Sequence, residues 1–446
     1  MQRNLTTGVL AAALCTPVVA MGESSAELDA LRAEMAAMQA ELAQLKGGTT
    51  AQATADLKAA TDAALLDAQS RINYQAEEMT AGHNGKNFFL ESADGAFSLG
   101  LSAQAQVRYI YNNRTNAPGT GIDDGDNLAG FQLRRTKIKG KGHIADPKVT
   151  YSFSFSSNRD TNNTGLEVLT VGYKFDNGIN LTAGRFKAPF AFDELTSSSR
   201  QQAAERALVT EQFTLGHTEG IQVDFKPMDD LKIRAMLSDG ANAGEGGNGD
   251  FNETPADLAI TVRGDYTIGG SKGFAKDYTS WVEDEMGINI GGAVHHEVAK
   301  TGVNQATGGL DSFTRLTVDA LYNNSGISFF AAAYFEVQEA AGGGVESDPF
   351  GLLAQAGYTI DDKWEPFVRY EFIDTDVAGV DEVSVITAGV NYYLKKHSAK
   401  FTIDGVFVLD PLDATNLTVS DSLGLQGDAA GEDGQFALRA QFQLLF

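Results

Sequence analysis

The last eleven residues of the chain alternate between the two faces of an extended strand. Side chains in a strand have a period of two, so one face here is apolar and the other is mostly polar. Such a strand is the closing strand of a membrane barrel or, alternatively, the edge strand of a soluble sandwich, where it would invite aggregation. The apolar face holds Phe436, Leu438, Ala440, Phe442, Leu444 and Phe446, and the polar face includes Arg439, Gln441 and Gln443.

Residues 1–20 resemble a secretory signal peptide. Arg3 supplies the positive start, the stretch 5–19 is largely apolar, and residues 18–20 fit a small-residue cleavage site. Cys15, the one cysteine, lies inside this segment, so we expect a mature chain without thiols, disulfides or cysteine-ligated metals. After this segment the sequence has no run of about 18 consecutive apolar residues, so no transmembrane helix is predicted.

The composition agrees with a chain of many strands joined by glycine-rich connections. Glycine is abundant at 48 residues, proline is scarce at nine, and there are 26 phenylalanines and 13 tyrosines. The net charge of −25 argues against nucleic acid as a partner, because phosphate backbones require lysine and arginine.

A short heptad pattern follows the signal peptide. Within residues 21–50 apolar residues are spaced alternately by three and four, which is the seam of a coiled coil. The alternative is a lone amphipathic helix lying on another surface. Residues 51–96 are alanine-rich at first and predict a helical periplasmic spacer or linker. The seam consists of Leu28, Leu31, Met35, Met38, Leu42 and Leu45.

From residue 97 onward the pattern changes to period two, and sixteen strands are predicted. The fold class is therefore all-β, with a transmembrane barrel over 97–446. The strands are expected at 97–111, 130–145, 148–158, 166–175, 178–187, 218–226, 231–238, 256–268, 286–297, 312–322, 326–337, 350–360, 364–374, 383–394, 399–410 and 434–446.

The connections between these strands alternate between short and long. Short turns such as 146–147 and 361–363 alternate with long acidic loops such as 239–255 and 411–433. A transmembrane barrel has short turns at one end and long loops at the other, whereas a soluble sandwich has no reason to sort its loops. One connection, 269–285, is longer than its place in this alternation predicts.

Three stretches resemble the phosphate-selective porin O and P family. They are Asn87 to Leu99 at the first strand, Phe131 to Arg135 at the second, and Ala183 to Phe190 with its continuation to Leu208. The resemblance covers about residues 85–446. It implies a trimeric, sixteen-stranded antiparallel outer-membrane barrel with an inward constriction loop. It also implies that the C-terminal strand is recognised by the outer-membrane insertion machinery.

Basic side chains alternate along the predicted second strand. Each would cost roughly 2–4 kcal/mol if it faced lipid at mid-depth, so they are expected to face the lumen. Arg185 and Lys187 repeat the pattern just before the loop 188–216, and a loop folded inward would bring Arg200 and Arg206 close to them. The alternative is an outward loop that packs on a neighbouring subunit. The predicted pore-lining residues are Arg108, Arg135, Lys137, Lys139, Lys141, Arg185, Lys187, Arg200 and Arg206.

A positive constriction favours anions, because a narrow pore of low dielectric focuses the field. Two observations keep the selectivity open. The lysines could pair with acids of the loop such as Glu194 or Glu205, and acids are also predicted at the inward positions Asp319, Glu371 and Asp404. Only a weak anion preference is therefore predicted, with phosphate as one candidate solute.

No catalytic, metal or cofactor site is predicted. The acidic stretch 123–127 lacks the full pattern of a calcium loop, and His295 and His296 point to opposite faces of a strand. The histidines show no motif with serine that would suggest a hydrolase.

These features together predict an outer-membrane porin for passive diffusion of small hydrophilic solutes. It would be a homotrimer embedded in outer-membrane lipid, with its N-terminal segment in the periplasm. The alternative hypothesis is an anchor that ties the barrel to the cell wall through its N-terminal coiled coil.

Overall fold

The computed structural model describes residues 33–38, 40, 58–63, 66, 79–85, 87–114, 127–158, 163–241, 256–299, 310–340, 346–377, 382–412, 417, 423–427 and 434–446. The chain divides into two units, Met1–Glu77 and Glu78–Phe446. In the described part, no helix combines the length and the apolar character needed to cross a membrane.

The N-terminal unit is described only in short helical pieces, at residues 33–38, 40, 58–63 and 66. Met35 and Met38 of the predicted seam lie in the first piece, and Met38 is 53% exposed. Short helices of this kind do not support the predicted coiled coil. The signal peptide 1–20 and the seam residues Leu28, Leu31, Leu42 and Leu45 lie outside the described residues.

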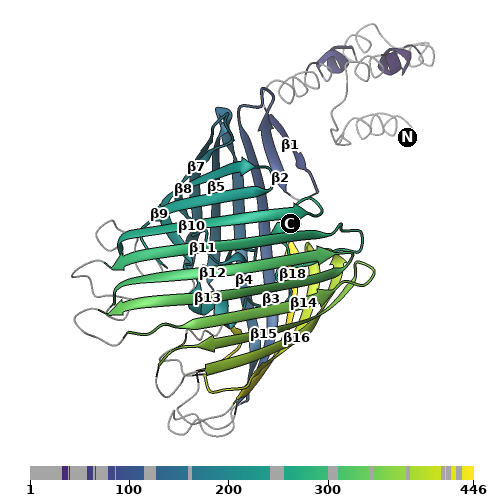
Figure 1. The fold of residues 1–446 in the computed structure, drawn as a ribbon. Coiled ribbons are helices and arrows are strands. Elements are labelled where there is room, and N and C mark those ends of the chain that lie inside the picture. The colour runs from purple at the N-terminus through teal and green to yellow at the C-terminus, as the bar shows by residue number, and fades with distance from the viewer. Residues whose placement is uncertain are drawn as a thin grey trace. The chain divides into compact units, whose positions relative to one another are not determined.

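The second unit is a closed antiparallel barrel of sixteen strands, β3 to β18, which Figure 1 shows as one continuous wall. All sixteen predicted strands are present, with ends that differ by a few residues. Their bounds are β3 Ser98–Arg114, β4 Asn127–Ile144, β5 Asp146–Asn158, β6 Asn163–Lys174, β7 Asn180–Lys187, β8 His217–Met228, β9 Leu231–Ser238, β10 Ala256–Gly269, β11 Gly287–Ala299, β12 Leu310–Asn324, β13 Ile327–Ala340, β14 Phe350–Tyr358, β15 Trp364–Asp374, β16 Glu382–Lys395, β17 Ala399–Val408 and β18 Gln435–Leu445.

The barrel closes where the last strand pairs with the first strand of the ring. β18 is antiparallel to β3 from Gln435 opposite Arg114 to Leu445 opposite Gln104. Phe446 continues this pairing, since its backbone N–H donates to the Ala103 carbonyl at 3.1 Å and its own carbonyl accepts from the Ala103 N–H. Closure satisfies every edge of the sheet, which a bilayer requires.

The two faces of the wall differ as the period of two predicts. Large apolar side chains are exposed on the outer face, for example Phe131 at 81% and Val318 at 59%. On the inner face β18 carries Arg439, Gln441 and Gln443, all buried. Such an outer surface fits hydrocarbon, whereas the inner surface fits water and polar groups.

One connection at the short-turn end is long. The strand pairs β4–β5, β8–β9, β12–β13 and β16–β17 are joined by one to three residues, but β10 and β11 are joined by residues 270–286. This connection contains the short helix η1, Phe274–Lys276, and a buried run at residues 278–280.

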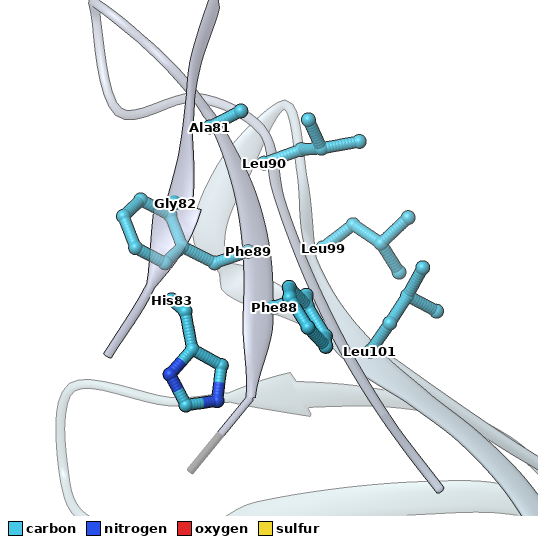
Figure 2. Close-up of a pocket in the computed structure, with 8 residues that line it drawn as sticks. All are labelled: Ala81, Gly82, His83, Phe88, Phe89, Leu90, Leu99 and Leu101. Carbon is cyan, nitrogen blue, oxygen red and sulfur yellow. The ribbon is translucent and has the colours of Figure 1, made fainter. Parts of the chain in front are cut away.

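Two strands were not predicted. β1, Met79–His83, and β2, Phe88–Ser92, form a hairpin, and β2 pairs with the first residues of β3. Both strands lie within the stretch 51–96, for which a helical spacer or linker was predicted. The part of that stretch at 79–92 is therefore a β-hairpin and not a helix. The hairpin and β3 enclose an apolar groove of about 490 Å³, shown in Figure 2.

Candidate functional site

The segment 188–216, between β7 and β8, lies inside the barrel and is held against the inner wall. It contains two short helices, α4 (Phe192–Leu195) and α5 (Leu208–Phe213). Side chains of seven wall strands donate hydrogen bonds to its backbone carbonyls. The donor–acceptor pairs are Gln106 to Ser198, Arg263 to Phe190, Arg315 to Thr214, Arg369 to Glu205, Asn391 to Gln202, Lys400 to Gln201 and Gln443 to Ser199.

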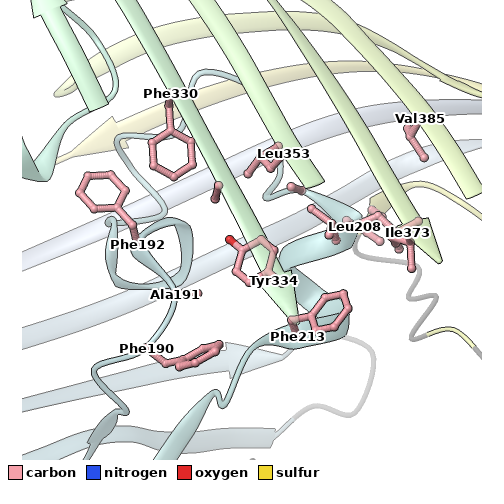
Figure 3. Close-up of a cluster of buried hydrophobic side chains, with 14 of the residues drawn as sticks. Phe190, Ala191, Phe192, Leu208, Phe213, Phe330, Tyr334, Leu353, Ile373 and Val385 are labelled. Atoms are coloured by element: carbon pink, nitrogen blue, oxygen red, sulfur yellow. The ribbon is translucent and has the colours of Figure 1, made fainter. Parts of the chain in front are cut away.

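An apolar cluster fixes the same segment to β13 and β14, as Figure 3 shows. Phe192 stacks on Phe330 with ring centroids 5.1 Å apart, and Phe213 stacks on Tyr334 at 5.5 Å. These four rings are at most 5% exposed. Packing of this kind holds the segment in one position against the inner face of β13 and β14.

Glu205 is the charged centre of the segment. Its carboxylate pairs with three arginines: Arg108 at 3.3 Å, Arg134 at 2.6 Å, and Arg135 in a short contact. The Glu205 side chain is fully buried. Burial alone would raise its pKa, but the three guanidinium groups outweigh burial and hold the pKa of Glu205 well below its ordinary value.

Arg134 was not predicted to face the lumen, because strict alternation puts it opposite Arg135. A β-bulge changes this. Gln106 is opposite Arg135 while the next residue, Val107, is opposite Leu133, so Arg134 is the extra residue and both arginines point inward. A sign of the bulge was present in the sequence. Leu133 and Ile138 are both apolar and both lie on the outer face, although residues five positions apart in a regular strand lie on opposite faces.

A second charge cluster lies where the segment leaves β7. Glu194 pairs with Lys187 at 2.8 Å and with Arg206 at 3.1 Å. Arg206 also donates to the Thr196 carbonyl at 3.0 Å and to the Asp193 carbonyl at 3.2 Å, so it ties the segment to itself. Burial acts to raise the pKa of Glu194, but the two cations outweigh burial and lower the pKa to about 2.

The structure separates the nine predicted pore residues into two groups. Arg108, Arg135 and Arg206 are at most 7% exposed and contact the inward segment. The other six are half-buried, except Lys141, which is exposed. These are Lys137 (paired with Glu167), Lys139, Lys141, Arg185 (paired with Glu219 at 2.9 Å), Lys187 and Arg200.

Lys139 and Lys141 differ from the other lysines on β4. The Lys139 ammonium donates to the Gln104 side-chain carbonyl at 2.8 Å, and no ion pair of Lys139 occurs within the described ranges. Lys141 is exposed, and it too has no ion pair in that part of the chain. In the described part of the chain, neither ammonium group is therefore in direct contact with a carboxylate.

The acids predicted on the inner wall are paired instead of free. Asp319 accepts two hydrogen bonds from Arg263, Glu371 pairs with Arg369 at 2.8 Å, and Asp404 accepts two from Arg439. All three acids are at most 5% exposed. They lie on the part of the wall that the inward segment covers, so each contributes no net charge to the open lumen.

Glu211 on α5 gives the site a pH dependence. Burial, together with Glu194 and Glu205, raises the pKa of this carboxyl to about 7. It is charged above that pH and neutral below it. We expect anion preference to increase between about pH 8 and pH 6, because one negative charge is lost, and Glu211→Gln to abolish this dependence. Reversal potentials at several pH values would measure it, and an unchanged profile in the variant would contradict the assignment.

Among the residues that the structure describes, no group of three or more histidine, cysteine or acidic side chains is placed to hold a metal ion.

Comparison with known proteins identifies the family and the fold. The family model of the phosphate-selective porins O and P matches residues 104–404, more than half of the chain. No curated protein sequence matches. An anion-selective porin from Comamonas acidovorans has a TM-score of 0.54 at 14% identity, over 78% of this chain and 100% of that one. OprB of Pseudomonas putida has a TM-score of 0.53 at 9% identity, over 79% and 95%. Identities this low show a shared fold alone.

Proposed function

We propose that this chain, which belongs to the phosphate-selective porin O and P family, passes small hydrophilic solutes by passive diffusion with a weak preference for anions. The family and the closed barrel make it an outer-membrane channel. The anion preference is supported by one observation: the lysines Lys139 and Lys141 face the lumen without a carboxylate partner in the described part of the chain.

The charges around Glu205 also support a preference for anions. Three guanidinium groups surround one carboxylate, so the cluster carries a net charge of about +2. Fixed charge in a narrow passage with walls of low dielectric attracts the opposite ion and repels the like ion. A small anion is therefore favoured over a small cation as it passes the inward segment.

The net charge of −25 does not contradict this preference. Selectivity depends on the charges that meet water at the narrowest part, and not on the sum over the chain. The wall acids Asp319, Glu371 and Asp404 are neutralised by arginines and covered.

Strong selectivity for phosphate is not part of this proposal. Tight recognition of a phosphate group needs several donors that are free to converge on it. Arg108, Arg134 and Arg135, the densest group of donors in the site, already bind Glu205. We therefore expect discrimination by charge more than by the chemical identity of the anion.

Reversing the charge of Lys139 tests the proposal. In a gradient of potassium chloride across a planar bilayer, the wild-type channel is expected to give a reversal potential of anionic sign. Lys139→Glu replaces a positive charge in the lumen by a negative one, so we expect the chloride-to-potassium permeability ratio to fall about threefold or more.

The matched control is Lys363→Glu, the same change of charge in the exposed turn between β14 and β15. It should leave the reversal potential close to that of the wild type. A cation-selective wild-type channel would refute the proposal outright, and equal effects of both substitutions would remove Lys139 from the site.

We also propose a homotrimer, with the N-terminal segment in the periplasm. The trimer rests on the arrangement implied by the family resemblance, and native mass spectrometry of the detergent-solubilised protein tests it.

A further inference from the structure

The connection 270–286, the one that is too long for its end of the barrel, contacts three successive short turns. The Trp281 carbonyl accepts from Gly326 at 3.0 Å, the Val282 N–H donates to Asp362 at 2.9 Å, and Asp277 binds His397 at 2.9 Å. These partners belong to the β12–β13, β14–β15 and β16–β17 turns. The connection is thus fastened across the short-turn mouth and is not a free loop.

The same connection contacts the inward segment 188–216 through Tyr278, which is 1% exposed. The Tyr278 hydroxyl donates to Asp193 Oδ1 at 2.8 Å, and its ring packs against Phe192 and Phe330. Asp193 in turn receives hydrogen bonds from Arg206 at its carbonyl, at 3.2 Å. Tyr278 therefore connects the mouth of the barrel to the charge cluster around Glu194.

A second contact between the connection and the inward segment involves Arg200, a charged side chain that is partly exposed. The Arg200 side chain is 40% exposed, and its Nη1 donates to the Lys276 carbonyl at 3.2 Å. Its Nε lies 3.9 Å from Asp277 Oδ2. The Asp277 side chain is 13% exposed and is fixed by His397 and by the Thr279 N–H. A fixed carboxylate next to a partly exposed guanidinium both orients it and offsets its charge.

We propose that the β10–β11 connection is a second element of the constriction. Asp277 sets the position and effective charge of Arg200, and Tyr278 positions the inward segment. The passage is then shaped from two sides, by the loop 188–216 and by a connection from the opposite end of the barrel. This inference rests on the proposed channel function, and it assigns specificity to a residue outside the constriction loop.

The charge part of the proposal is tested by Asp277→Asn. Asparagine keeps the size of the side chain and removes the negative charge, so Arg200 contributes its full charge to the passage. We expect the chloride-to-potassium permeability ratio to rise about twofold in bilayer measurements. The matched control is Glu283→Gln, which removes one acid from an exposed position on the same connection.

A double variant tests whether Asp277 acts through Arg200. In Arg200→Gln, the added substitution Asp277→Asn should have much less effect on the permeability ratio, because the charge that it releases is gone. If Asp277→Asn and Glu283→Gln give equal shifts, or if the effect of Asp277→Asn persists without Arg200, the inference is wrong while the proposed channel stands. If the purified wild type forms no channel, the proposed function itself fails.

The positioning part is tested by Tyr278→Phe, which removes the hydroxyl bound to Asp193. The inward segment loses one fixed contact, and we expect open-channel current noise to increase at least about twofold without a change in reversal potential. Tyr266→Phe is the control, since Tyr266 is 43% exposed on the outer face of β10. Equal noise in the two variants would overturn this role for Tyr278.

Discussion

Replacing Glu205 by glutamine is expected to make the channel strongly anion selective and to destabilise the inward segment. The substitution removes the one carboxylate that Arg108, Arg134 and Arg135 share. Three cations then stand close together without the carboxylate that they share. Two of them, Arg108 and Arg135, are at most 5% exposed and cannot be stabilised well by water.

The expected cost follows from the burial of the group. Breaking a buried ion pair on one side costs about 3–5 kcal/mol, because the partner charge stays buried and unpaired. We expect the segment to move so that the arginines become hydrated. Bilayer recordings should then show about a fivefold or larger rise in the chloride-to-potassium permeability ratio, and unfolding in urea should show a loss of stability of this order.

Glu219→Gln is the matched control for this prediction. Glu219 also pairs with an arginine, Arg185, at 2.9 Å, but its side chain is 33% exposed. A pair that keeps contact with solvent contributes less than a fully buried one, and exposed pairs contribute at most about 1 kcal/mol. If Glu205→Gln proves as stable as Glu219→Gln, the buried cluster does not hold the segment as described.

The barrel could be predicted because its signal is local. A period of two along each strand and the alternation of connection lengths both appear in short windows of sequence, and all sixteen strands were found with small errors at their ends. The hairpin of β1 and β2 was missed. Each of its strands has five residues, too few for a period of two to stand out beside an alanine-rich stretch.

The contents of the lumen were less predictable, because they depend on contacts between residues far apart in the chain. Glu205 pairs with residues about 70 to 97 positions away. Strict alternation predicted that Arg135, Lys137 and Lys139 face inward, but it could not show that Arg135 is buried while Lys139 is half-buried. It also gave no sign that Arg134 faces inward, because one bulge reverses the parity of the residues beyond it.

Replacing residues 192–213 by a short glycine–serine linker is expected to widen the channel and to abolish most of its selectivity. The ends of the deletion can be joined, because β7 and β8 stay paired up to Lys187 opposite His217, and the Ala188 N–H donates to the Gly216 carbonyl at 3.2 Å. The barrel wall does not depend on the segment for its backbone hydrogen bonds. We therefore expect the variant to fold.

The segment covers much of the inner wall, so its removal exposes Asp319, Glu371 and Asp404 together with their arginines. Each of these acids stays paired with its wall arginine and adds no net charge. Arg108, Arg134 and Arg135 lose Glu205, but they then border a wider passage in which each fixed charge acts from a greater distance. Single-channel conductance in concentrated potassium chloride should rise roughly two- to fourfold, and the permeability ratio should fall toward one.

Two measurements make this result interpretable. Heat-dependent mobility on gels shows whether the variant barrel is folded, and Lys139→Glu provides a channel whose selectivity falls while the segment remains in place. Conductance should distinguish the deletion variant from Lys139→Glu, since only the deletion is expected to raise it. A folded deletion variant with wild-type conductance would show that the segment does not narrow the passage in the membrane. The wild-type charges at Glu205 and Lys187 would then not act at the narrowest part of the passage.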